Sequence, residues 1–160
     1  MEEFRDIEGF PGYAVSNFGR VINTRWNREM THSLTQHGEH TVGLTQFNQQ
    51  HRRSIKVLVA KAFVEGETDI FDTPMLLDGD RSNLDANNIV WRPRWFALMY
   101  AKQFEHEQSW WYAGPVIDSH GTVYLSLVDA AMQTGTLLRD IRDSLMNDTK
   151  VFPQGYTFHF

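Results

Sequence analysis

The chain has 160 residues, of which 41% are hydrophobic, and this is enough apolar material for one compact domain or two small ones. It has no Cys, which excludes disulfides and thiolate zinc sites and fits a reducing cytoplasm. The net charge of −5 is unusual for a strong phosphate binder, because DNA affinity comes largely from Lys and Arg. No segment approaches the roughly 20 apolar residues of a membrane span, and the N-terminus lacks a signal-peptide pattern, so we expect no membrane contact.

The first half of the chain predicts short strands and one helix. Residues 7–21 alternate apolar residues with Gly, Pro and Asn-Phe-Gly turns, which is typical of a small sheet. Residues 41–47 alternate as a strand, and the following turn leads to Arg52 and Arg53, so we expect a hairpin with a basic tip. Residues 56–64, Lys-Val-Leu-Val-Ala-Lys-Ala-Phe-Val, resemble a short helix of phage and intron-encoded HNH homing endonucleases, and this resemblance implies a helix here.

The next segment predicts a strand, a loop and a second strand that ends near Trp91. Pro93 suits the first turn of a following helix. Apolar residues recur on this helix at spacings of three and four, at Phe96, Met99, Tyr100 and Phe104, and mark its buried face. The order of elements is ββα.

The end of the chain predicts a hairpin, two helices and a last strand. Residues 116–124 carry a hairpin pattern, and Ser126 and Asp129 form a capping box that opens a helix. Gly135 suits the turn to a second helix over residues 137–146, which makes a helix-turn-helix, and residues 155–160 suit a strand.

These segments resemble three modules of phage and intron-encoded HNH homing endonucleases, in the same order. Residues 7–21 resemble the NUMOD4 motif, residues 74–91 resemble the HNH motif, and the C-terminal helices resemble a NUMOD1-type helix-turn-helix. The resemblance implies an α+β fold, with a small antiparallel sheet, a degenerate ββα-metal motif and the helix-turn-helix. It also implies the domains 1–102 and 112–160, joined by a linker over 103–111.

The resemblance also bears on catalysis. In the family, a polar metal ligand and a histidine base precede the Asp-Gly turn, and a third chemical residue lies on the helix. Here these positions hold Met75, Leu76 and Ala97, while Asn88 matches a family residue that fixes the loop. Because Leu accepts no proton and a thioether is a poor ligand for magnesium, we expect no catalytic residue, no cofactor and no strand scission: the chain is predicted not to be an enzyme.

One alternative keeps the chemistry but moves it. Asp78, Asp80 and Asp85 could gather a cation, with His51 or His106 as the base, although Asp-Gly-Asp is also a common turn composition. The histidines at 32, 37 and 40 have no ligand spacing, and we expect them at the surface.

Without catalysis, the first hypothesis is a protein that binds DNA without cutting it. Lys and Arg exceed Asp and Glu by eight to six over residues 1–64. The candidate DNA contacts are arginines of this half and three residues of the second C-terminal helix: Arg20, Arg25, Arg28, Arg52, Arg53, Arg139, Arg142 and Ser144. A solvated surface is the alternative for all of them, and Asp140 and Asp143 would oppose phosphates.

The second hypothesis is a repurposed scaffold that binds a basic host protein or a phage protein. Residues 65–91 carry one Arg against seven Asp and Glu, which would repel DNA but could meet a basic groove. The candidate contacts are Asp72, Asp78, Asp80, Asp85, Trp110 and Trp111. We expect Trp91 and Trp95 in the core. The family resemblance suggests a phage or mobile element, and thus the cytoplasm of a bacterial host.

Overall fold

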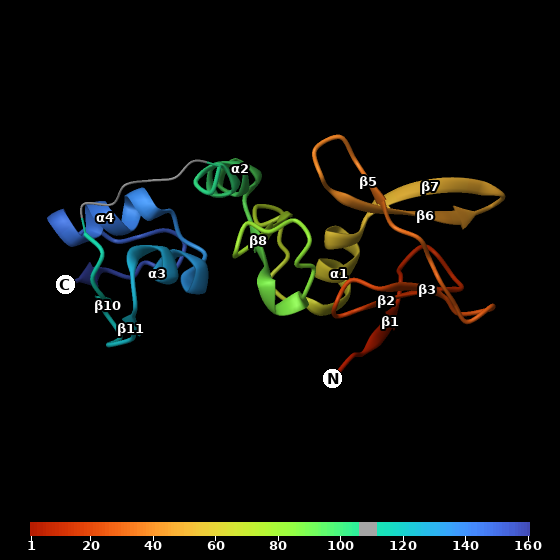
Figure 1. The fold of residues 1–160 in the computed structure, drawn as a ribbon, viewed down its shortest axis with the longest axis horizontal. Coiled ribbons are helices and arrows are strands. Elements are labelled where there is room, and N and C mark those ends of the chain that lie inside the picture. The colour runs from red at the N-terminus through yellow and green to blue at the C-terminus, as the bar shows by residue number, and fades with distance from the viewer. Residues whose placement is uncertain (106–111) are drawn as a thin grey trace. The chain divides into compact units, whose positions relative to one another are not determined.

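The computed structural model describes residues 1–105 and 112–160, and these divide into two compact units. Unit 1 comprises Met1–Leu76 and Asp80–Ala97, and unit 2 comprises Leu77–Gly79 and Leu98–Phe160 (Figure 1). The predicted domain boundaries at 102 and 112 stay a prediction.

Unit 1 opens with a four-stranded antiparallel sheet in the order β1-β2-β3-β4. Its strands are β1 (Phe4–Asp6), β2 (Tyr13–Ser16), β3 (Val21–Asn23) and β4 (Arg28–Glu29). Gly19 lies in the β2–β3 turn with a φ of 88°, and a Cβ there would come within 2.7 Å of the Leu84 side chain. Only glycine suits this turn, because the conformation and the close approach both exclude a side chain.

A second antiparallel sheet has the order β5-β6-β7, with β5 (Ser33–Leu34), β6 (His40–Gln46) and β7 (Gln49–Ser54). Phe47 and Asn48 form the β6–β7 turn with φ angles of 49° and 60°, the positive values of a type I′ hairpin. Arg52 and Arg53 therefore lie within β7 rather than at the tip of the predicted hairpin. Helix α1 (Ile55–Phe63) follows directly.

The ββα elements come next and have the predicted order. Strands β8 (Thr73–Leu76) and β9 (Ile89–Arg92) pair antiparallel, and a 3-10 turn, η1 (Ala86–Asn88), precedes β9. Helix α2 (Arg94–Lys102) begins directly after Pro93. Phe96 and Tyr100 are fully buried as expected, and Phe104 lies beyond the end of the helix.

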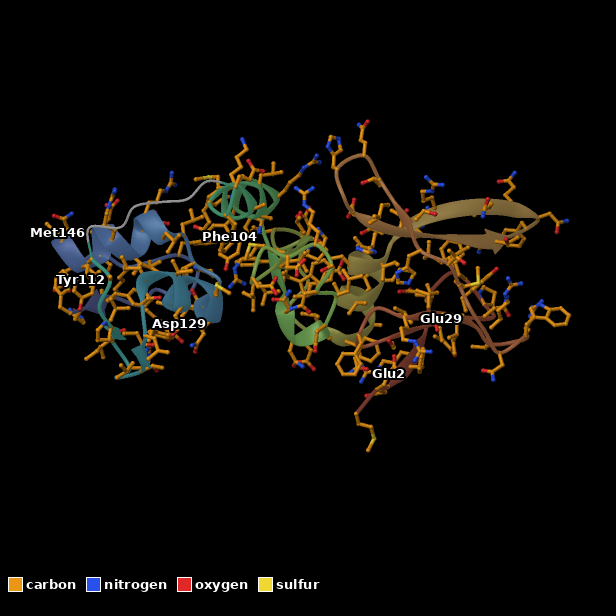
Figure 2. The ribbon with its side chains drawn as sticks, viewed as in Figure 1. Glu2, Glu29, Phe104, Tyr112, Asp129 and Met146 are labelled. Carbon is orange, nitrogen blue, oxygen red and sulfur yellow. The ribbon has the colours of Figure 1, made fainter. Side chains whose placement is uncertain are left out.

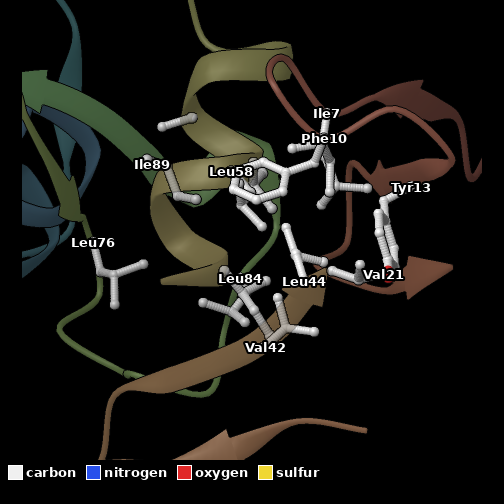
Figure 3. Close-up of a cluster of buried hydrophobic side chains, with 14 of the residues drawn as sticks. Ile7, Phe10, Tyr13, Val21, Val42, Leu44, Leu58, Leu76, Leu84 and Ile89 are labelled. Atoms are coloured by element: carbon white, nitrogen blue, oxygen red, sulfur yellow. The ribbon is translucent and has the colours of Figure 1, made fainter. Parts of the chain in front are cut away.

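The core of unit 1 collects residues from both sheets, α1 and the ββα elements. Val42 and Leu44 point from β6 toward Leu58 of α1 and Leu84 of the β8–β9 loop (Figure 3). Each such aliphatic side chain contributes about 1.5–3 kcal/mol when fully buried. Trp91 belongs to this core, as predicted, but Trp95 is 56% exposed, so its placement in the core was wrong.

Unit 2 contains the predicted helix-turn-helix and a small sheet. Its helices are α3 (Leu127–Thr134) and α4 (Leu138–Asn147), and its strands are β10 (Val116–Asp118), β11 (Val123–Tyr124) and β12 (Phe158–His159), in the order β11-β10-β12. Ser126 Oγ accepts the Asp129 NH at 3.1 Å, and Gly135 ends α3 with a φ of 64°. Both features match the prediction from the sequence, and the α+β prediction is confirmed.

Within the residues that the structure describes, no helix has the length and apolar character of a membrane span.

Candidate nucleic-acid interface

The ββα motif buries the three positions at which the family carries its chemistry. Met75 and Leu76 lie on β8, with 3% and 9% of their surface exposed, and Ala97 lies on α2 with 9% exposed. A thioether and two hydrocarbon side chains do not fit a hard divalent cation, which prefers oxygen ligands. These positions therefore do not match the metal that the motif implies.

Asn88 makes two hydrogen bonds within the loop between β8 and β9. Its Nδ2 donates to the carbonyl of Asn83 at 3.0 Å, and its backbone NH donates to the carbonyl of Asp85 at 2.9 Å. Side-chain and backbone bonds from one residue therefore fix the loop between β8 and β9.

Three acidic residues in or next to this motif, Asp72, Asp80 and Asp85, accept hydrogen bonds from residues close in sequence. Asp80 accepts from the Ser82 hydroxyl at 2.7 Å and the Ser82 NH at 2.9 Å, and these bonds hold its pKa below the ordinary value. Asp85 caps η1 by accepting from the Asn87 NH at 2.9 Å. Asp72 accepts from the Thr73 hydroxyl at 2.9 Å.

The relocated metal site stays a hypothesis. Among residues 1–105 and 112–160, no three His, Cys, Asp or Glu side chains gather as a metal would require. The proposed base His51 lies edge-on to the Phe10 ring at 5.7 Å, and His106 lies outside the described residues.

His32 and His40 form a pair that sequence reasoning missed. Their ring centroids are 5.9 Å apart, edge to face, and both residues are half-buried rather than at the surface. The His32 Nε2 and the His40 Nδ1 are buried without a hydrogen-bond partner in the described part of the chain. Burial and the neighbouring His40 lower the pKa of His32, so its imidazole is neutral at neutral pH.

The five candidate arginines of unit 1 separate into two groups. Arg20 is committed to ion pairs, with Nη1 2.8 Å from Glu2 and Nη2 2.9 Å from Glu29. Figure 2 labels both glutamates, of which Glu2 precedes β1 and Glu29 belongs to β4. Arg53 lies over the Phe10 ring at 5.1 Å and donates to the Arg52 carbonyl at 3.0 Å.

Arg25, Arg28 and Arg52 form the second group. All three are exposed, and none makes a side-chain hydrogen bond or ion pair with the residues that the structure describes. They are the arginines of this set that have their guanidinium groups open to an anion.

Arg28 and Arg52 line a groove of about 870 Å³ between the β3–β4 turn and the second sheet. Trp26 forms one wall and is 79% exposed, and Gly43 and Gln50 line the groove beside β7. We call this the tryptophan groove. Its carboxylate, Glu29, is the one that Arg20 neutralises, so the uncompensated charge of the groove is positive.

The candidates on α4 are less open. Arg139 and Arg142 are exposed, but each lies 3.2 Å from the carboxylate that follows it, Asp140 or Asp143. Ser144 is 1% exposed and accepts the Phe158 NH at 2.8 Å, so its hydroxyl supports the sheet of unit 2 and is not open to solvent. The candidates Trp110 and Trp111 lie outside the described residues.

Comparison with known proteins identifies relatives of the chain. The NUMOD4 motif matches residues 2–45. The chain is 31% identical over 94 residues to the DNA endonuclease I-HmuI of Bacillus phage SP01. These residues make up 58% of this chain and 51% of the relative. The chain therefore spans about half the length of that curated relative.

A solved structure of DNA binding and cleavage by the HNH homing endonuclease I-HmuI has the same fold. The two structures match with a TM-score of 0.59 and 23% identity, over 98% of this chain and 97% of the other. The expected resemblance is thus confirmed: the chain carries a NUMOD4 motif and is a homologue of I-HmuI with its fold.

The prediction that the chain is not an enzyme is contradicted. Its relative is a DNA endonuclease, and this relationship points to a nuclease. The prediction was drawn from Met75, Leu76 and Ala97 alone, and three side chains do not exclude chemistry by other groups of the same fold.

Proposed function

We propose that this relative of I-HmuI binds double-stranded DNA, with the tryptophan groove and its arginines against the phosphate backbone. The observation that carries the proposal is that Arg28 and Arg52 line the groove together with the neutralised Glu29, and that their guanidinium groups have no partner among the described residues. Guanidinium groups without a protein partner bind phosphates by releasing the counterions of the DNA. A local positive surface serves this role although the net charge of the chain is −5.

We infer that unit 2 adds a second contact through α4. A helix-turn-helix places its second helix in the major groove, and α4 follows Gly135 with the required spacing. Arg139 and Arg142 are the contacts that this helix offers, and each must leave its neighbouring carboxylate to reach a base or phosphate. This requirement makes α4 the weaker of the two contacts.

The relationship to a DNA endonuclease supports hydrolysis of a phosphodiester bond as the reaction. The side chains of Met75, Leu76 and Ala97 do not fit a metal ion, so the proposed reaction uses no metal at these positions. The phage origin of the relative supports the cytoplasm of a bacterial host as the location.

A gel shift of the full chain on duplex DNA at several salt concentrations tests the proposal. The logarithm of the association constant should fall linearly with the logarithm of the salt concentration, with a slope of about −0.9 for each phosphate contact. Affinity that does not change with salt, or no binding at low salt, would contradict the proposal. Plasmid nicking with and without a chelator, run on the same preparation, tests hydrolysis.

A further inference from the structure

The exposed position of the Trp26 side chain is fixed by hydrogen bonds of the local backbone. Asn23 Oδ1 accepts from the Arg25 NH at 3.0 Å and from the Trp26 NH at 3.2 Å. Asn27 completes the turn in a left-handed conformation, with a φ of 47°. An exposed indole gives up the stabilisation that burial would provide, and this turn holds it in that position.

A glycine shapes the groove beside β7. A Cβ on Gly43 would come within 2.4 Å of the Gln50 Nε2, so the missing side chain leaves the space in which the Gln50 amide lies. That amide makes no hydrogen bond with the described residues. A glutamine amide carries donors and an acceptor, and it can bind the edge of a nucleobase.

The groove thus combines an aromatic face, a free amide and two free cations, Arg28 and Arg52. Its volume of about 870 Å³ lies in the range of pockets that hold small organic ligands. A paired base inside a duplex presents no face to an indole, because its neighbours cover both faces. A base outside the stack presents one.

We propose that the tryptophan groove holds one unstacked DNA base. The Trp26 indole stacks on the base, the Gln50 amide binds its edge, and Arg28 and Arg52 hold the flanking phosphates. The inference rests on the proposed DNA binding and specifies the feature of the substrate that the groove selects. It predicts a preference for duplexes in which a base leaves the stack at little cost.

Two duplexes of the same sequence, one fully paired and one with a single extrahelical 2-aminopurine, provide the test. The full chain should bind the second duplex about tenfold more tightly, the gain expected from stacking one base on an aromatic side chain. Its 2-aminopurine fluorescence should be quenched on binding, because the indole stacks on the base.

Trp26→Ala should abolish the preference and the quenching, so that the variant binds the two duplexes with equal affinity. Trp26→Phe should retain part of both effects. Phe47→Ala is the matched control, because Phe47 is a 90% exposed aromatic residue on the neighbouring β6–β7 turn that does not line the groove.

Equal affinity for the two duplexes, or a preference that survives Trp26→Ala, overturns the inference and leaves the proposed DNA binding intact. Failure to bind either duplex overturns the proposed function, and the inference falls with it.

Discussion

Arg20 Nη2 lies 2.9 Å from Glu29 Oε2, and the same guanidinium reaches Glu2 through Nη1 at 2.8 Å. One arginine therefore joins the residues before β1 to strand β4 and neutralises a carboxylate in the wall of the tryptophan groove. The hydrogen bonds that Arg20 donates to Glu29 and Glu2 raise the pKa of Arg20, and the bond from Arg20 lowers the pKa of Glu29, so both side chains stay charged.

Arg28→Ala and Arg20→Ala should therefore weaken DNA binding in different ways. Arg28→Ala removes a phosphate contact, so the salt slope should become shallower by about one and the affinity should fall for all sequences. Arg20→Ala removes no contact but leaves Glu29 unpaired in the groove, so affinity should fall with little change in slope. Gel shifts over a salt series measure both. An equal loss of slope in the two variants would show that Arg20 contacts phosphate.

Gly43→Ala should change the groove without unfolding unit 1. The new Cβ meets the end of the flexible Gln50 side chain, which can swing away, and Ala suits the interior of a strand better than Gly. We expect an unfolding free energy within about 0.5 kcal/mol of the native chain. Selection of the extrahelical base should decrease, because the Gln50 amide is displaced. A thermal melt and the two-duplex assay check these outcomes, and undiminished selection would show that Gln50 does not contact the base.

The His32–His40 pair should make unit 1 sensitive to mild acid. Burial and His40 lower the pKa of His32 below its ordinary 6.5, so the unfolded chain binds a proton there more readily than the folded chain. The free energy of unfolding of unit 1 is therefore not reduced by His32 above about pH 6.5, and it declines as the pH falls below this value. His32→Gln should flatten this decline, and the exposed His37→Gln should not. Melting temperatures between pH 8 and pH 5 provide the measurement, and identical profiles for the two variants would contradict the expectation.

Asp118 should stabilise unit 2. Burial pushes the pKa of its carboxyl upward, but hydrogen bonds from the Thr122 NH, the Tyr124 hydroxyl and the His120 NH outweigh this and hold the pKa below its ordinary value. Burial and the same bond raise the pKa of Tyr124 to about 12. Asp118→Ala leaves three donors unsatisfied and should cost about 2–3 kcal/mol in urea unfolding.

The dependence of the unfolding free energy on pH in the acid range gives a second test of Asp118. Because its folded pKa is lowered, its contribution is present above the unfolded value near 3.8 and is lost as the pH falls below it. The control is Asp140→Ala, which removes one partner of an exposed ion pair and should cost at most about 1 kcal/mol. Equal losses for the two variants would show that the Asp118 bonds contribute nothing specific.

Most of the fold could be predicted from local signals. Three features depend only on neighbours in sequence, and each appears where expected. They are the capping box at Ser126 and Asp129, the left-handed conformation of Gly135 and the strand over residues 41–47. Trp95 was misplaced because a helical residue next to a buried one can face solvent, and composition does not indicate the face.

The candidate interface depended on contacts between distant residues. Nothing in the sequence indicates that Arg20 is bound by Glu2 and Glu29 while Arg28 is free, because those pairs form across the sheet. The pairing of β5 with β6 sets Leu34 opposite His40 and so brings His32 close to His40. This register is a contact between strands, and the spacing of the histidines does not indicate it. The activity was misjudged because it was argued from single positions and not from the relationship as a whole.

The bonds that Asn88 makes within the β8–β9 loop connect protein to protein and need neither a metal nor a base. The shape of this motif and its reactivity therefore rest on different residues. The side chains at 75 and 76 take no part in these bonds, so the frame of the motif does not depend on them.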